Sequence, residues 1–215
     1  MKRINDIVSD AIDVRINDDN KDKTFDISKI DFELLSREFA HTRRKNLLLR
    51  DLDELVNQQL AKMLFANPQR IDYYDRYQEI IDAYNAEQNR ATIEKTFMDL
   101  MELASSLDTE QQRYVREGFS SDEELSVYDL LFSENLTKQE IETIKKVSVD
   151  LLTKIKQQIA KLDHWTDKQE TKAIVDNLIR NTLWQELPNS YDVSDIQTYQ
   201  KKIYEYVYMR YPEVA

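Results

Sequence analysis

Hydrophobic residues recur along this chain at the three- and four-residue spacing of a helix face. An α-helix has about 3.6 residues per turn, so residues i, i+3, i+4 and i+7 share one side of it. The clearest stripe, with Ile144, Leu151 and Ile155 among its members, runs from Thr137 to Leu162. Other segments predict a short helix over 4–12, one long helix or two abutting helices over 28–67, one helix between Pro68 and Asn85, and one from Thr92 to Leu107.

The second half of the chain carries four candidate capping boxes. In such a box an N-cap hydroxyl and an acid or amide three residues later satisfy backbone donors that the first helical turn leaves unpaired. The pairs are Ser121 with Glu124, Thr137 with Glu140, Thr166 with Gln169, and Ser194 with Gln197. No segment alternates in the manner of a strand, and no repeat of fixed period is found. The predicted fold is all-α, a multi-helix bundle of long and short helices with no significant sheet.

Residues 15–24 interrupt the helical pattern with a charged stretch that has no apolar periodicity. Such a composition is typical of a loop or linker. We therefore predict an N-terminal helix and acidic linker over 1–27, followed by a C-terminal helical domain over 28–215.

Glycine is almost absent, and this excludes several kinds of site. The chain of 215 residues has a single glycine, Gly118, and three prolines. Phosphate-binding loops and nucleophile elbows need glycine, because only a residue without Cβ freely adopts positive φ or lets a ligand reach the backbone. Most nucleotide-binding and hydrolase motifs are therefore ruled out.

The rest of the composition limits the metal sites, the cellular compartment and the binding partners to be expected. There are no cysteines and only two histidines, which excludes disulfides and cysteine–zinc sites. No run of about 18 apolar residues occurs, so we expect a cytoplasmic protein with no membrane contact. The net charge of −11 repels polyanions, so any nucleic-acid surface must be a local basic patch.

Three motifs resemble reactive or metal sites only superficially. Asp18 opens a run with the first ligand spacings of a calcium loop, but lysines occupy the positions that need glycine and glutamate. Asp163, Glu170 and Lys172 are residue types with which nucleases bind Mg²⁺ and polarise a phosphodiester. Such sites normally lie on a small sheet, whereas Glu170 and Lys172 lie in a predicted helix. His164 has no nucleophile tied to it by spacing and is interpreted as a helix-junction residue. We assign no catalytic, cofactor or metal residue.

Arg43, Arg44 and Lys45 form the densest basic cluster and are candidates for a weak phosphate contact. The plainer interpretation, which we prefer, is a solvated helix end beside Glu38 and Asp51.

Tyrosines are numerous and gather near the C-terminus. Of the twelve, Tyr204, Tyr208 and Tyr211 form a second apolar line on the last helix, beside the residues that suffice for a core. Tyrosine buries a large ring while keeping its hydroxyl wet, which suits interfaces. The three are therefore candidates for a partner interface, and a broad core-facing stripe is the equal alternative.

Ordered sequence blocks resemble a known family. The first is Asn67-Pro68-Gln69-Arg70-Ile71-Asp72-Tyr73-Tyr74, which continues to Asn85. Further blocks precede or follow it in the same order, namely 46–52, 92–97, 116–119, 128–131 and 165–169. Together they resemble the C-terminal helical region of the restriction (R, motor) subunit of type I restriction-modification enzymes, from about Arg44 to Pro212. Residues 1–43 match less clearly.

The resemblance implies that this chain is the last part of a longer subunit, so that Met1 need not be its natural start. In that family the preceding parts are a nuclease and two ATP-driven motor domains that translocate DNA. Their ATP and magnesium are not assigned to any residue here. The implied function is non-catalytic docking of the nuclease-motor to the methyltransferase and specificity subunits during cleavage of foreign DNA. The expected partners are those subunits, the motor domains, and DNA through the complex. The alternative is a helical nucleic-acid-binding module that lines the DNA path.

Overall fold

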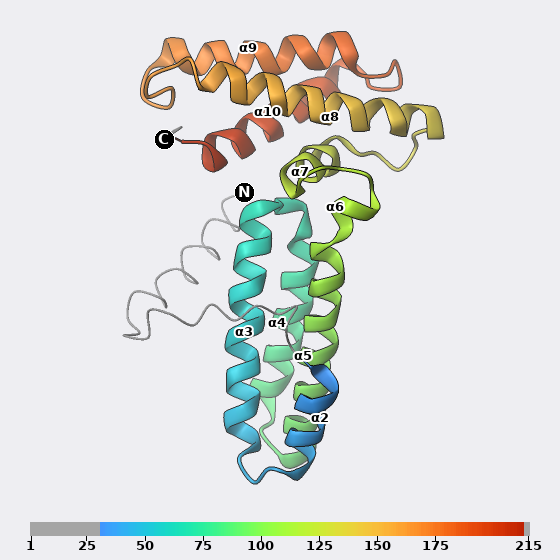
Figure 1. Ribbon diagram of the computed structural model, residues 1–215, viewed down its shortest axis with the longest axis vertical. Coiled ribbons are helices and arrows are strands. Elements are labelled where there is room, and N and C mark those ends of the chain that lie inside the picture. The colour runs from blue at the N-terminus through green and yellow to red at the C-terminus, as the bar shows by residue number, and fades with distance from the viewer. Residues whose placement is uncertain (1–30, 213–215) are drawn as a thin grey trace. The chain divides into compact units, whose positions relative to one another are not determined.

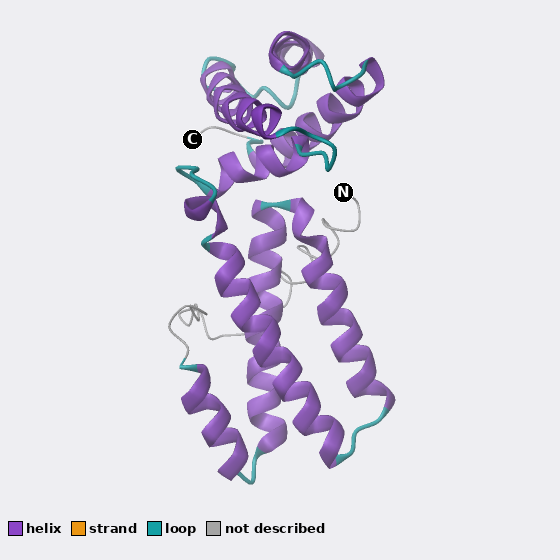
Figure 2. Ribbon diagram, turned by 90° about the vertical axis from the view of Figure 1, so that its right-hand side faces the viewer, coloured by secondary structure: helices purple, strands orange, loops and turns teal. Residues whose placement is uncertain are grey.

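The computed structural model describes residues 31–212, and within them it is entirely helical (Figures 1 and 2). Nine α-helices and one 3₁₀ helix occur in this range, and none of its residues forms a strand. The predicted all-α fold is therefore confirmed. The helix and linker predicted over 1–27 lie outside the described residues, so the domain boundary near residue 27 stays a prediction.

The described chain separates into two compact units, one ending at Arg113 and the other beginning at Tyr114. The hydrophobic pattern did not anticipate this division. The first unit contains α2 (Phe32–His41), α3 (Lys45–Ala66), η2 (Pro68–Arg70), α4 (Ile71–Ala86) and α5 (Arg90–Gln111). After the short α6 (Arg113–Arg116), the second unit contains α7 (Asp122–Leu131), α8 (Lys138–Ile159), α9 (Gln169–Glu186) and α10 (Val193–Arg210).

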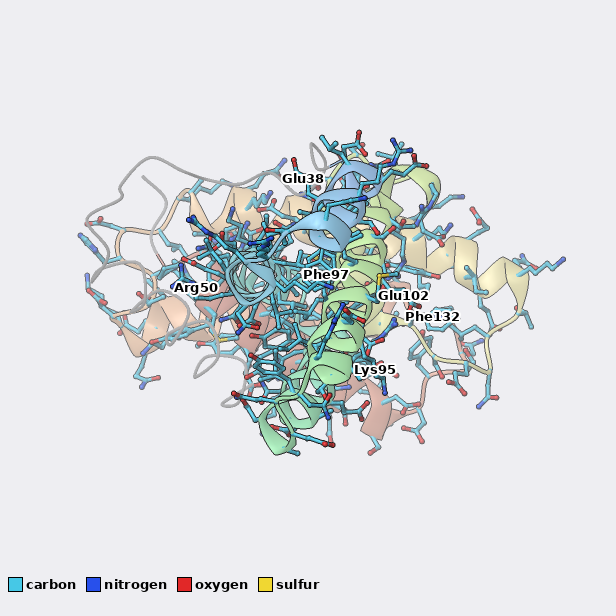
Figure 3. All side chains as sticks on the ribbon, turned by 90° about the horizontal axis from the view of Figure 1, so that it is seen from below. Glu38, Arg50, Lys95, Phe97, Glu102 and Phe132 are labelled. Carbon is cyan, nitrogen blue, oxygen red and sulfur yellow. The ribbon has the colours of Figure 1, made fainter. Side chains whose placement is uncertain are left out.

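In the first unit α3, α4 and α5 pack side by side around an apolar core (Figure 1). Val56, Phe97 and Leu100 are fully buried in it, and Figure 3 shows Phe97 among the side chains between α5 and α3. The helix α2 joins this core through Phe39, whose ring stacks on Phe97 with centroids 3.6 Å apart. A buried aromatic pair of this kind adds roughly 0.5–1.5 kcal/mol beyond the burial of its area.

Polar side chains set the helix boundaries of the first unit. The described part of the segment 28–67 holds two helices, because the chain breaks at Thr42, whose hydroxyl accepts from the Arg44 backbone N–H at 3.1 Å. Asn67 ends α3 as predicted, and its side chain accepts from the Gln69 N–H at 3.1 Å. The helix expected to begin at Thr92 starts earlier, at Arg90, because the side chain of Asn89 caps it.

The second unit is built from four helices, with α8 packed on α7 and α9, and α10 packed on α9 and α7. The stripe predicted on α8 is confirmed, since Ile144, Leu151 and Ile155 are fully buried. The helix itself ends at Ile159, and Leu162 lies half-buried in the following loop.

Two of the four predicted N-caps are confirmed and two are wrong. Thr137 and Glu140 form the complete reciprocal box at the start of α8. Ser121 caps α7, although the Glu124 side chain accepts from the N–H of Ser120 instead. Ser194 lies inside α10, because the Asp192 and Asp195 pair forms the box two residues earlier.

The fourth prediction fails because Thr166 is drawn away from the helix. Its hydroxyl donates to the Pro212 carbonyl at 3.2 Å, and the N-cap of α9 is Lys168, which makes no side-chain cap. The Thr166 hydroxyl, three residues before a glutamine, fits the capping-box pattern, but it binds the distant Pro212 carbonyl instead.

The single glycine ends α6. Gly118 has a φ of +84°, the left-handed conformation that side chains with a Cβ rarely adopt. Its N–H donates to the Val115 carbonyl at 3.1 Å, and the Phe119 N–H donates to the Tyr114 carbonyl at 2.9 Å. This pair of bonds is the Schellman arrangement that commonly closes helices.

Candidate functional site

The predicted tyrosine line lies along α10 and meets the buried tryptophan of the loop between α8 and α9. Trp165 is 1% exposed and packs edge-on against Tyr204 and Tyr208, with ring centroids 6.2 and 5.7 Å away. Tyr208 remains 39% exposed, and the Lys172 ammonium lies 5.6 Å from its ring centre. The line therefore has an inner side bound within the unit and an outer side open to solvent.

Trp165 also holds the end of α10. Its indole Nε1 donates to the Tyr211 carbonyl at 2.6 Å, while the Thr171 hydroxyl donates to the Trp165 carbonyl at 2.8 Å. The backbone carbonyl of Tyr211 thus binds Trp165, a structural role that the spacing of the tyrosines did not predict. The assignment of Tyr204, Tyr208 and Tyr211 to a partner interface stays a prediction.

A charged cluster lies beside the same end of α10. Glu123, in the first turn of α7, pairs with Lys156 of α8, and its Oε1 lies 3.6 Å from Arg210 Nη2. Burial alone would raise the pKa of the Glu123 carboxyl, but Lys156, the Tyr211 hydroxyl and Arg210 lower it below its usual value. Lys156 also lies 5.4 Å from the centre of the Tyr211 ring. Three helices are joined through this one carboxylate.

The predicted phosphate-contact residues lie at the turn from α2 to α3 and at the start of α3. Arg43 and Arg44 are exposed there. Lys45 is half-buried, with its Nζ 2.6 Å from Glu94 Oε1 and 4.9 Å from the centre of the Phe39 ring. The Nε of Arg90 reaches the same Glu94 oxygen at 3.2 Å, so the start of α5 adds a cation to this turn. The structure does not test whether the turn contacts a phosphate, and the assignment stays a prediction.

The family block at residues 67–74 builds a buried ion pair. Arg70 is 4% exposed, and its Nε donates to Glu110 Oε1 at 3.0 Å. Arg113 Nη1 donates to the same oxygen at 2.9 Å. Because a buried charge without a partner is costly, this arrangement fixes η2 against the end of α5. The block is structural in the first instance, as its sequence indicated.

A second polar pair ties α4 to α3. The Tyr77 hydroxyl donates to Asp53 Oδ1 at 2.7 Å, and the Tyr77 side chain is buried. Burial raises the pKa of Asp53, and the hydrogen bond from Tyr77 opposes that rise. These groups anchor α4 to α3.

Sequence reasoning missed one conspicuous residue, Trp184. It lies on α9 and is 51% exposed, whereas the other tryptophan of the chain is buried. Periodicity alone puts Trp184 off the face that carries Val175, Ile179 and Leu183, but which faces the neighbouring helices cover is decided by tertiary packing.

The residues with superficial resemblance to reactive sites do not converge. Within residues 31–212 no three histidine, aspartate or glutamate side chains are grouped in a way that could hold a metal ion. Glu170 and Lys172 lie in the first turns of α9, and His164 lies in the connection from α8 with a φ of 45°. The calcium-like run near Asp18 lies outside the described residues.

Comparison with known proteins places this helical chain among the subunits of DNA restriction enzymes. The family described as "Type I restriction enzyme HindI endonuclease subunit-like, C-terminal" matches residues 1–211. The chain belongs to this family, and it is the C-terminal part of a type I restriction enzyme endonuclease subunit.

Searches of the curated proteins and of the solved structures found no significant match. No helix among the described residues is long and apolar enough to cross a membrane.

Proposed function

We propose that this chain is a non-catalytic docking module that attaches the nuclease and motor parts of its subunit to the methyltransferase-specificity core. The observation that carries the proposal is the family match over residues 1–211, which makes the chain part of one subunit of a larger enzyme. The complex acts on foreign DNA, and we expect it to work in the cytoplasm. In this proposal ATP and magnesium serve the other domains, and no residue of this chain takes part in the reaction.

The packing of the helices supports such a role. Each unit encloses an apolar core, and buried polar links such as Arg70 with Glu110 fix the ends of its helices. A helical surface held rigidly in this way loses little conformational entropy when it binds a partner. Large apolar side chains that stay exposed, such as Trp184 and Ile174, are the type of residue that protein interfaces bury.

The test is direct binding between the purified 215-residue chain and the methyltransferase-specificity complex of the same restriction system. We expect a stoichiometric complex in analytical ultracentrifugation and a dissociation constant of about 1 μM or tighter, which is ordinary for a specific protein interface. Excess chain should also inhibit cleavage by the complete enzyme, because it competes for the docking site. Absence of binding at tens of micromolar, together with no inhibition, would overturn the proposal.

A nucleic-acid-binding role is the second candidate, and one observation favours it. Arg43, Arg44 and Arg90 place exposed guanidinium groups around one turn, in a chain that is acidic overall. If this turn follows a DNA backbone, Arg43→Ala with Arg44→Ala should weaken binding to duplex DNA and make it less dependent on salt. Arg180→Ala, which removes an exposed arginine from α9, is the matched control. Equal DNA binding by all variants would reject this candidate.

A further inference from the structure

The end of α10 extends past the apolar core of the second unit. The last buried residues of the helix are Ile203, Tyr206 and Val207, whereas none of residues 208–212 is buried. A stretch without buried side chains gains little from the hydrophobic effect, so its position depends on the individual contacts that it makes. We call this stretch the 208–212 segment.

The loop between α8 and α9 holds the backbone of this segment. The loop spans residues 160–168 and lies beside the end of α10 (Figure 1). The Trp165 indole donates to the Tyr211 carbonyl at 2.6 Å, and the Thr166 hydroxyl donates to the Pro212 carbonyl at 3.2 Å. Two neighbouring side chains of the loop thus bind two neighbouring carbonyls of the segment, and both bonds break if the loop and the segment move apart.

Charged side chains hold the same segment from two helices. Glu123 of α7 has its Oε1 at 3.6 Å from Arg210 Nη2, and it also pairs with Lys156 of α8. The Lys156 ammonium lies 5.4 Å from the centre of the Tyr211 ring. These charges remain partly exposed, so water screens them and each contact contributes only modestly. The segment is therefore held by a small number of separate contacts instead of a core.

The loop that holds the segment has a strained backbone. His164 has a φ of 45°, in the left-handed region that residues with a Cβ occupy at a cost. The Asp167 N–H donates to the His164 carbonyl at 3.0 Å, and the Thr171 hydroxyl donates to the Trp165 carbonyl at 2.8 Å. Strain of this kind persists only where the surrounding contacts maintain it, so release of the segment would let the loop relax.

We propose that the α8–α9 loop and the 208–212 segment form a latch that opens locally while the rest of the second unit stays folded. The two hydrogen bonds from the loop keep it closed. In the closed state the Trp165 ring packs edge-on against Tyr204 and Tyr208. Opening separates these rings and exposes an aromatic surface that the closed unit hides. The inference describes a change of conformation within this chain, so it does not depend on the proposed docking role.

Hydrogen exchange followed by NMR on the 215-residue chain tests whether the loop and the segment open together. Three protons report on the latch, namely the Trp165 indole N–H, the Asp167 amide and the Tyr211 amide. We expect them to share one protection factor, because a single opening exposes all three. That factor should be at least about tenfold below those of the Ile155 and Val207 amides, which belong to fully buried residues of the core.

Thr166→Val removes one donor of the latch and keeps the shape of the side chain. Loss of such a hydrogen bond corresponds to about two- to tenfold in the opening equilibrium, so all three protons should exchange faster by one common factor in that range. Thr153→Val is the matched control, because the exposed Thr153 hydroxyl donates to the Val149 carbonyl within α8. The control should leave all three exchange rates unchanged.

Trp165→Phe keeps an aromatic ring but removes the indole N–H. The Asp167 and Tyr211 amides should then exchange faster by a similar factor, while the Ile155 and Val207 amides keep their wild-type rates. Equal acceleration of all four amides would show that Trp165 supports the whole core, and the latch would be rejected.

Two results with the other chains would also overturn the proposal. Three unequal protection factors in the wild type would show that the loop and the segment open independently. A response of the Tyr211 amide alone to Thr166→Val would show that the end of α10 frays by itself, without the loop.

Discussion

Gly118 illustrates how a single residue can be required by backbone geometry alone. An added Cβ would meet no atom within 4 Å, so space is not the constraint. The constraint is the φ of +84°, which costs an L-residue roughly 1–2 kcal/mol. We therefore expect Gly118→Ala to lower the free energy of unfolding of the second unit by about 1 kcal/mol, measured by chemical denaturation. Gly118→Asn should lose less unfolding free energy, because asparagine tolerates positive φ. An alanine variant as stable as the wild type would contradict this explanation.

Glu123 gives the second unit a dependence on pH. Lys156 and Arg210 lower the folded-state pKa of this carboxyl below its value in the unfolded chain. Its contribution to stability is therefore complete above the unfolded pKa and is lost as pH falls through the folded pKa. We expect Glu123→Gln to destabilise the unit at pH 7 by about 1 kcal/mol and to have a much smaller effect at low pH.

The measurement for Glu123 is a series of denaturation curves between pH 7 and pH 3, followed by tryptophan fluorescence. Glu142→Gln removes the same charge from an exposed position on α8 and serves as the control. An equal loss of stability at every pH would show that Glu123 acts through packing and not through its charge.

At the scale of single elements, the sequence predicted helices better than it predicted their ends. The stripe on α8 needed only local periodicity, and it appeared as expected. Thr166 and Ser194 matched the capping pattern equally well, yet neither caps a helix. The difference lies in competitors, since Asp192 precedes Ser194 and the Pro212 carbonyl binds Thr166. A capping pattern identifies side chains that could cap a helix, but it does not show which other contacts compete for those side chains.

The two candidate caps of α10 provide a direct comparison. The Asp192 carboxylate accepts from the Asp195 N–H at 2.8 Å, and Asp195 in return accepts from the Asp192 N–H at 3.0 Å. Replacement of an N-cap by alanine typically costs about 1 kcal/mol. We expect that loss of unfolding free energy for Asp192→Ala and nearly none for Ser194→Ala. The reverse order in thermal and chemical denaturation would restore Ser194 as the cap.

For the whole molecule, the sequence indicated the fold class and the family but not the division into two units. Both units share the same helical periodicity, and the chain between them contains no long polar linker, so the boundary at Arg113 and Tyr114 had no local signal. Of the candidate sites, the tyrosines of α10 were found because they are many and clustered. Trp184 was overlooked because its exposure depends on which face α8 and α10 cover, and that is decided by tertiary packing.

The two units can be followed separately because both tryptophans, Trp165 and Trp184, lie in the second one. The buried core cluster around Phe97 consists of residues from the first unit alone, so a cavity there should weaken that unit. Phe97→Ala removes a fully buried ring from the first unit and should cost about 3–5 kcal/mol there. We expect circular dichroism to show an earlier transition in this variant, while the unfolding midpoint from tryptophan fluorescence stays unchanged.

Leu151→Ala, at an equally buried position of the second unit, should produce the opposite pattern and move the fluorescence midpoint to lower denaturant. The two variants together separate local from global effects, because each serves as the control for the other. If Phe97→Ala shifted the fluorescence midpoint as far as the circular dichroism midpoint, the chain would unfold as one cooperative body.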